Sequence, residues 1–154
     1  MPFADPRPSL AEVKAMSIRR FEDLKVWQEA RKLAQIIYRL TKGESFGLDR
    51  DLRWQLQDAA VSSMGNIAEA HGRYSFEDKR RFPDVSRGSC KEVQSHLYVA
   101  LDQAYIKQAD FDEAYGQAEV VAQLLTPIRR NPSLAKTPRA QRKARCNHGI
   151  THTG

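Results

Sequence analysis

The chain has 154 residues, of which 41% are hydrophobic and 29% are charged. This size suits one domain with a hydrophobic core, and no apolar run approaches the length of a membrane-spanning helix. The two cysteines, Cys90 and Cys146, lie far apart and show no Cys-x-x-Cys spacing. We therefore expect neither a disulfide framework nor a zinc knuckle, but a protein of the reducing cytoplasm.

The net charge of +6 is concentrated at the two ends of the chain. Residues 131–154 carry +5 without any acidic residue, residues 1–20 carry +2, and residues 21–130 carry −1. We accordingly predict an N-terminal extension over 1–20, one folded domain over 21–130 and a basic tail over 131–154. The high overall positive charge therefore does not indicate a nucleic-acid-binding domain that is basic throughout, because the predicted folded domain is nearly neutral.

The basic tail contains no aromatic residue and only two large apolar ones, Leu134 and Ile150. It cannot bury enough surface to offset the entropy of ordering, so we expect it to be disordered. Its cations could bind phosphates without reading sequence, or could simply keep the protein soluble. They are Lys136, Arg139, Arg142, Lys143 and Arg145.

Between residues 21 and 130, apolar residues recur every three or four positions and never alternate, which predicts helices and no strands. The first predicted helix covers residues 24–41, with Asp23 as its N-cap. The second covers residues 50–71, with Asp49 as its N-cap.

The third predicted helix begins at Ser75, in a capping-box pattern, and ends near Lys107. Pro83 lies inside it and should bend or restart the helix, because proline removes one backbone hydrogen bond. A second capping-box pattern, Asp110 with Glu113, opens the fourth predicted helix. Four amphipathic helices with short connections predict an all-α, antiparallel up-down-up-down four-helix bundle.

Apolar positions of the first predicted helix span about 200° of its circumference, roughly twice the arc that a single core requires. We therefore expect a subunit interface at Trp27, Ile36 and Tyr38. Coverage of this arc by the N-terminal segment is the alternative.

Residues 59–72 of the second predicted helix are unusually small: eight of the fourteen are Ala, Ser or Gly. Small side chains let helix axes approach each other closely. We expect close packing here rather than a backbone surface open to a ligand.

Residues typical of catalysis do not form a recognisable motif. A di-iron centre in a bundle needs Glu-x-x-His on two helices, and this sequence has no Glu-x-x-His. Phosphate-binding glycine loops and Gly-x-Ser-x-Gly are also missing. Asn66, Glu69 and His71 lie near each other, but hydrogen bonding across helices or to the following turn is a simpler role for the first two than acid–base catalysis. We expect no enzyme activity, no cofactor and no metal site.

The third predicted helix carries four basic residues that could form a folded nucleic-acid-binding face. Interspersed acidic residues allow the alternative of an ordinary solvated surface. The basic residues are Arg80, Arg81, Arg87 and Lys91, and the acidic ones are Glu77, Asp78 and Glu92.

Two segments carry a family resemblance: residues 21–28 read F-E-D-L-K-V-W-Q, and residues 59–69 read A-A-V-S-S-M-G-N-I-A-E. Together with Gln55-Leu56, Gly88-Ser89 and Glu92, they resemble the bacterial four-helix bundle family known from 23S rRNA intervening sequences. The likeness spans about residues 21–130. Two departures concern the connection between the second and third helices: Ala70 stands where the family usually has Gly, and Pro83 lies where an uninterrupted helix is expected.

The resemblance implies an all-helical bundle that assembles into a ring-shaped homopentamer. It also implies a relation to the accessory proteins of diversity-generating retroelements, which associate with nucleic acid and a reverse transcriptase. We therefore expect a non-enzymatic oligomer that binds RNA or DNA through the basic residues named above. The alternative is a protein–protein scaffold, or an accessory subunit for a cytoplasmic partner such as a reverse transcriptase.

Overall fold

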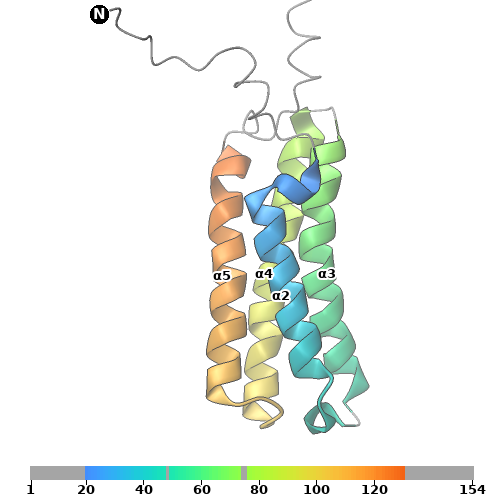
Figure 1. Ribbon diagram of the computed structural model, residues 1–154, viewed down its shortest axis with the longest axis vertical. Helices are drawn as coiled ribbons and strands as arrows, with labels where there is room; N and C mark the ends of the chain where they lie inside the picture. The colour runs from blue at the N-terminus through green and yellow to red at the C-terminus, as the bar shows by residue number, and fades with distance from the viewer. Residues whose placement is uncertain (1–19, 48, 74–75, 131–154) are drawn as a thin grey trace, which may run out of the picture.

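The computed structural model describes residues 20–47, 49–73 and 76–130. These residues form four α-helices, and no strand occurs among them. The helices run alternately up and down (Figure 1), which confirms the predicted all-α bundle. The elements are η1 (Phe21–Asp23), α2 (Lys25–Thr41), η2 (Glu44–Phe46), α3 (Arg50–Gly72), α4 (Phe76–Asp102) and α5 (Gln108–Arg130), where η marks a 3-10 turn.

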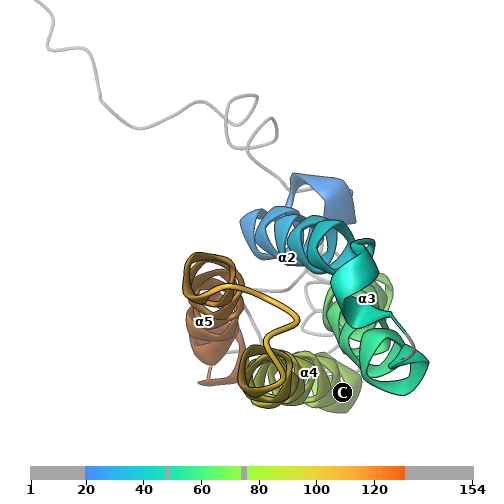
Figure 2. The ribbon, with the colours of Figure 1, turned by 90° about the horizontal axis from the view of Figure 1, so that it is seen from below.

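Seen along its long axis, the bundle places α2, α3, α4 and α5 in cyclic order around the core (Figure 2). Each helix packs against the two that flank it, and the α3–α4 pair packs most extensively. No helix in the described ranges pairs enough length with enough hydropathy to traverse a lipid bilayer.

Side chains from all four helices build one continuous hydrophobic core. Every position that the periodicity of the second predicted helix places inward is buried in α3. Those positions are Leu52, Leu56, Ala59, Ala60, Ser63 and Ile67. The largest side chains that are almost fully buried are Phe46, Leu33, Ile37, Leu56, Leu97 and Leu125.

The N-terminal caps of the first two helices differ in how well the sequence predicts them. Asp49 caps α3 as predicted, since its Oδ1 accepts a hydrogen bond from the Leu52 N–H at 3.1 Å. The prediction for Asp23 is wrong: α2 has Leu24 as its N-cap residue, without a side-chain cap. The reason is a competing 3-10 turn, in which the Leu24 N–H donates to the Phe21 carbonyl at 3.0 Å and Asp23 becomes part of η1.

The third helix runs through its proline without a break. α4 is continuous across Pro83, which is buried, so the helix does not restart there. It ends at Asp102, five residues before the predicted end near Lys107. Ala104 adopts a left-handed conformation with φ of 57°, which terminates the helical hydrogen-bond pattern earlier than the apolar periodicity predicts.

The start of the fourth helix is also shifted relative to the capping pattern. α5 begins at Gln108, which places Asp110 inside the first turn instead of at the N-cap. Asp110 still acts on the helix start, because its Oδ2 accepts from the Lys107 N–H at 3.4 Å. The predicted cap of α4, Ser75, lies outside the described residues.

Serine hydroxyls permit the close packing of α3 against α4. The Ser86 hydroxyl donates to the Ser63 carbonyl at 2.6 Å, and the hydroxyls of Ser62 and Ser89 bond each other at 3.0 Å. Ser63 and Ser86 are fully buried, so these bonds satisfy polar groups that would otherwise destabilise the interface. Close helix packing therefore explains the buried small residues of α3, Ala59, Ala60 and Ser63.

Replacing Ser86 by leucine should test this packing. Ser86→Leu inserts a large side chain where no space exists, so we expect a loss of about 1–3 kcal/mol in the free energy of unfolding. Urea denaturation measures the loss, and Ser95→Leu on the exposed side of the same helix is the control, with a change below about 0.5 kcal/mol. Equal stability of the two variants would contradict the close α3–α4 contact.

Candidate nucleic-acid interface

The four cations predicted on the third helix do not form one common basic face. Arg80 and Arg81 are exposed near the start of α4, Arg87 is half-buried, and Lys91 lies further along the helix. Neighbouring residues in an α-helix point about 100° apart, which separates Arg81 from the side that Arg80, Arg87 and Lys91 share. Only Arg80 and Arg81 are both exposed and without an ion pair to a described residue.

Lys91 instead fastens α4 to α5. Its Nζ donates to Glu119 Oε2 at 3.0 Å and to Gln94 Oε1 at 2.9 Å, and Gln94 Nε2 donates to the same carboxylate at 3.1 Å. These hydrogen bonds, led by that from Gln94, lower the pKa of Glu119, so the carboxylate stays ionised and balances the lysine. The charge of Lys91 is therefore compensated within the protomer.

The helix with the strongest outward positive charge is α2, which the sequence reasoning did not single out. Its exposed cations are Lys25, Arg31, Lys32 and Arg39, with Lys42 just beyond its end. The one acidic residue of α2, Glu29, is buried. The sequence contains a signal for this, because Glu29 falls on the same helical stripe as Val26, Leu33 and Ile37.

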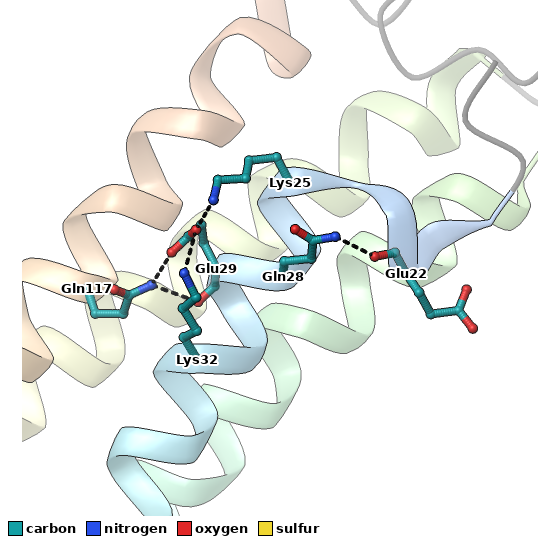
Figure 3. A network of polar contacts seen from close by, with 6 residues as sticks. All are labelled: Glu22, Lys25, Gln28, Glu29, Lys32 and Gln117. Atoms are coloured by element: carbon teal, nitrogen blue, oxygen red, sulfur yellow. Dashed lines mark hydrogen bonds and ion pairs between the residues drawn. The ribbon is translucent and has the colours of Figure 1, made fainter. Parts of the chain in front are cut away.

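Glu29 is held by a polar network between α2 and α5 (Figure 3). Its carboxylate contacts the Nζ of Lys25 at 2.5 Å and of Lys32 at 3.0 Å, and accepts from Gln117 Nε2 at 2.9 Å. The same Gln117 amide also donates to the Glu29 carbonyl at 2.9 Å. The hydrogen bond from Lys25, followed by those from Gln117 and Lys32, lowers the pKa of Glu29 to about 2. One carboxylate shared by two lysines leaves a net positive charge on this part of α2.

The lowered pKa of Glu29 predicts a specific pH dependence of stability. A carboxyl that binds its proton less tightly in the folded state stabilises the fold above its ordinary pKa near 4.5, and this contribution disappears as the pH falls toward 2. We expect Glu29→Gln to lower the free energy of unfolding by about 1–2 kcal/mol at pH 7, with a smaller difference from wild type at pH 2.5.

Thermal or urea denaturation at several pH values measures this difference. Glu113→Gln is the matched control, because Glu113 is an exposed carboxylate paired with Arg39 on the same two helices. If the free energies of unfolding of the wild type and of Glu29→Gln differ by the same amount at pH 7 and at pH 2.5, the role assigned to Glu29 is wrong.

A shallow surface hollow of about 390 Å³ lies beside the first turns of α2. Its lining residues are Glu22, Trp27, Gln28, Arg31, Lys32 and Gln35. The Arg31 guanidinium carbon stands 5.9 Å from the centre of the Trp27 ring, and the Phe21 ring packs edge-on against the same indole at 5.1 Å. The hollow thus combines cations, amides and one aromatic ring.

The bundle has opposite charges at its two ends. The half that holds residues 20–33, 61–73, 76–89 and 119–130 carries a formal charge of +3. The other half, residues 34–47, 49–60 and 90–118, carries −3. α2 begins and α5 ends at the positive end (Figure 1), so residues 1–19 and 131–154 attach to the chain there. The predicted binding residues of the tail, from Lys136 to Arg145, lie outside the described residues.

The wide apolar arc of α2 is largely covered within the protomer. Trp27 and Ile36 are half-buried and pack against the core, on opposite sides of the helix. Tyr38 remains 41% exposed. A helix with two flanking neighbours buries a wider arc than a helix facing one core, which explains why the sequence pattern is so broad. The interface at these three residues stays a prediction.

Of the seven large apolar residues that are exposed in the described part of the chain, five lie on α3 and α4. Trp54 is 64% exposed, and Val61, Val85 and Val99 are exposed to a lesser extent. Sequence reasoning missed Trp54 because it lies opposite the inward stripe of α3, where a single aromatic residue breaks no pattern.

The polar residues near the end of α3 do not converge on a catalytic arrangement. Asn66 Nδ2 donates to the Ser62 carbonyl of its own helix at 2.7 Å, and Glu69 pairs with Arg73 in the following turn at 2.6 Å. The Asn66 bond therefore lies within α3 and not across helices. In the described ranges, no three His, Cys, Asp or Glu side chains lie close enough to hold a metal ion.

Cys90 should be chemically inert in the folded protein. Its side chain is fully buried, and burial raises the pKa of its thiol to about 12. In a Cys146→Ser background, where Cys90 is the only thiol, we expect a disulfide reagent to react at pH 8 only after unfolding in guanidinium chloride. Rapid reaction of the native protein would show that the α3–α4 interface opens, contrary to the packing described above.

Comparison with known proteins gives one family and a solved structure of the same fold. A family model described as 23S rRNA-intervening sequence protein matches residues 22–127. The solved structure is that of a protein with unknown function from the S23 ribosomal protein family of Bacteroides thetaiotaomicron VPI-5482. It superimposes with a TM-score of 0.64 at 19% sequence identity, over 69% of this chain and 99% of that one. No curated protein matches the chain.

Proposed function

The chain belongs to the 23S rRNA-intervening sequence protein family, and on that premise we propose that it is a non-enzymatic, cytoplasmic homo-oligomer that binds nucleic acid. The partner is RNA or DNA, contacted mainly through phosphates. The binding surface is the positive end of the bundle together with the basic tail.

The axial separation of charge is the observation that carries this proposal. Arg80 and Arg81 lie exposed at the positive end, and the tail with its five cations begins at the same end. Clustered cations on one surface attract the phosphate backbone through counterion release, which gives salt-sensitive affinity without sequence preference. The negative charge of the opposite end repels phosphates and so orients the protein on its partner.

Oligomer formation strengthens this attraction. In a ring with a single rotation axis along the bundle, such as the pentamer that the family resemblance implies, every positive end lies on the same face. Several weakly binding tails then act together through their effective concentration. The exposed Trp54, Val61, Val85 and Val99 support self-association, since a second subunit would remove these apolar side chains from water.

Three mid-helix glycines, Gly65 of α3, Gly88 of α4 and Gly116 of α5, leave space beside the helix backbone. A Cβ added to Gly65 or Gly88 would meet no other atom within 4 Å, so packing inside the protomer does not require glycine there. Glycine in a helix interior costs about 1 kcal/mol relative to alanine. A neighbouring subunit that approaches the helix backbone closely accounts for this cost.

Removing the cations should separate nucleic-acid binding from other roles. We expect a chain ending at Arg130 to bind labelled RNA and duplex DNA at least about tenfold more weakly than the full chain at low salt, with a salt slope reduced by several units. Arg80→Ala/Arg81→Ala should weaken binding further, because it removes two phosphate contacts. Fluorescence anisotropy at several salt concentrations measures both effects.

The matched control is Lys42→Ala/Arg50→Ala, which removes two exposed cations from the negative half. It should bind almost like the full chain. Equal losses from the two double variants, or no binding by the full chain at low salt, would contradict the proposal. A monomer in light scattering at micromolar concentration would contradict the oligomer.

The exposed apolar residues of α3 and α4 also favour a second function, that of a scaffold or accessory subunit for another protein. A scaffold should keep its protein partner when residues 131–154 are removed. It should lose that partner when Trp54 is replaced by a charged residue.

A further inference from the structure

The hollow beside α2 has the composition of a nucleotide site. Resting on the nucleic-acid binding proposed above, we propose that it holds one nucleotide of a single-stranded nucleic acid. The nucleotide's phosphate lies at Arg31 and Lys32, and its base stacks on the Arg31–Trp27 pair. This site lies on the folded domain and is independent of the basic tail.

The electrostatic balance of the hollow favours an anion. Arg31 has no carboxylate partner in the described part of the chain, and its guanidinium carbon lies 5.9 Å from the centre of the Trp27 ring. Lys32 shares the single charge of Glu29 with Lys25, as Figure 3 shows, so this group of three retains one positive charge. Arg31 and Lys32 both line the hollow, so a guanidinium and an ammonium are available there to one phosphodiester.

Glu22, the one carboxylate that lines the hollow, does not cancel the positive charge of Arg31 and Lys32. Glu22 Oε1 pairs with Arg20 at 2.8 Å, and the hydrogen bond from Arg20 lowers the pKa of Glu22. The charges of these two exposed residues therefore cancel. The positive charge of Arg31 and of the lysine pair remains available to a ligand.

Amide groups provide the remaining recognition elements. Gln28 Nε2 donates to the Glu22 carbonyl at 3.0 Å, which fixes this amide and leaves its oxygen as an acceptor (Figure 3). Gln35 is exposed and makes no hydrogen bond to a described residue, so both groups of its amide are free to meet a base edge.

The flat surfaces in the hollow favour an unpaired base over a duplex. Trp27 is half-buried, packs against Phe21 and the core, and lines the hollow together with Arg31. Bases stack on aromatic rings and on arginine planes only after they leave the helical stack of a duplex. The volume of about 390 Å³ lies within the range of small-ligand pockets and accommodates one nucleotide rather than a double helix.

Trp27 is itself a reporter for this site. The chain has two tryptophans, and Trp54 lies exposed in the opposite half of the bundle. The full-length Trp54→Phe variant keeps an aromatic ring on the surface proposed for self-association and leaves Trp27 as the only indole, and light scattering checks that it assembles like the wild type. We expect an oligouridylate of about ten nucleotides to quench Trp27 fluorescence on binding, because a base stacks on the Arg31–Trp27 pair.

Substituting Arg31 in the Trp54→Phe variant tests whether Arg31 contacts the bound nucleotide. Arg31→Ala should weaken oligouridylate binding about tenfold and abolish the quenching, since it removes a phosphate contact and a stacking surface. Lys42→Ala is the matched control, an exposed cation beyond the far end of α2, and should leave both signals unchanged. A DNA duplex of the same length should bind without quenching Trp27.

The outcomes distinguish this inference from the function on which it rests. If anisotropy shows binding of labelled oligouridylate while Trp27 emission is unchanged, or if Arg31→Ala behaves like Lys42→Ala, the nucleotide site is wrong and the proposed function stands. Equal quenching by the duplex would overturn the preference for an unpaired base. Absence of all binding at low salt would overturn both proposals.

Discussion

An antiparallel bundle with four helices returns the chain to the end from which it started. This constraint of topology decides where the charges of the protein meet. α2 begins and α5 ends at the same end, so the basic N-terminal and C-terminal segments attach next to the start of α4 with Arg80 and Arg81. A fifth helix would separate the two ends and disperse the charge. The proposed binding surface thus depends on the number of helices as much as on the basic residues themselves.

Buried carboxylates determine which cations remain available to a partner. Glu29 lies inside the bundle and neutralises only one of its two lysine neighbours, so α2 keeps an outward positive charge. Glu119 is half-buried on α5 and balances Lys91 completely, which removes that lysine from the proposed surface. Formal charge along a sequence therefore differs from the charge that a ligand meets, because ion pairs between helices cancel part of it.

The helices themselves could be predicted from the sequence because their information is local. The periodicity of α3 gives its inward residues, and Asp49 lies directly before the first turn that it caps. The failures at Asp23 and Asp110 are also local, but each reflects competition between two short-range patterns. A 3-10 turn takes over Asp23, and the left-handed Ala104 with its shortened α4 moves the start of α5 ahead of Asp110.

The candidate site could be predicted far less well, because it depends on which helices lie side by side. Arg80 and Arg81 were recognised as basic, but the compensation of Lys91 requires knowledge that α5 packs against α4. Trp27 was recognised as lying on an unusually wide apolar arc, yet its contact with Phe21 and Arg31 depends on the turn before α2. Of this arc, Trp27 also lines the hollow, which only the contacts between elements reveal.

The exposure of apolar residues in the protomer favours self-association through α3 and α4 more than through α2. On α2 the two flanking helices cover much of the wide arc, Tyr38 stays exposed, and the interface at these residues stays a prediction. On α3 and α4, Trp54 and Val85 lie outside the core-facing stripe, and Gly65 and Gly88 have no packing reason within the protomer. In the protomer, Lys25, Arg31 and Lys32 are exposed on a different helix, α2. An oligomer built through α3 and α4 would therefore leave the cationic face of α2 accessible, so that self-association and nucleic-acid binding use different sides of the same bundle.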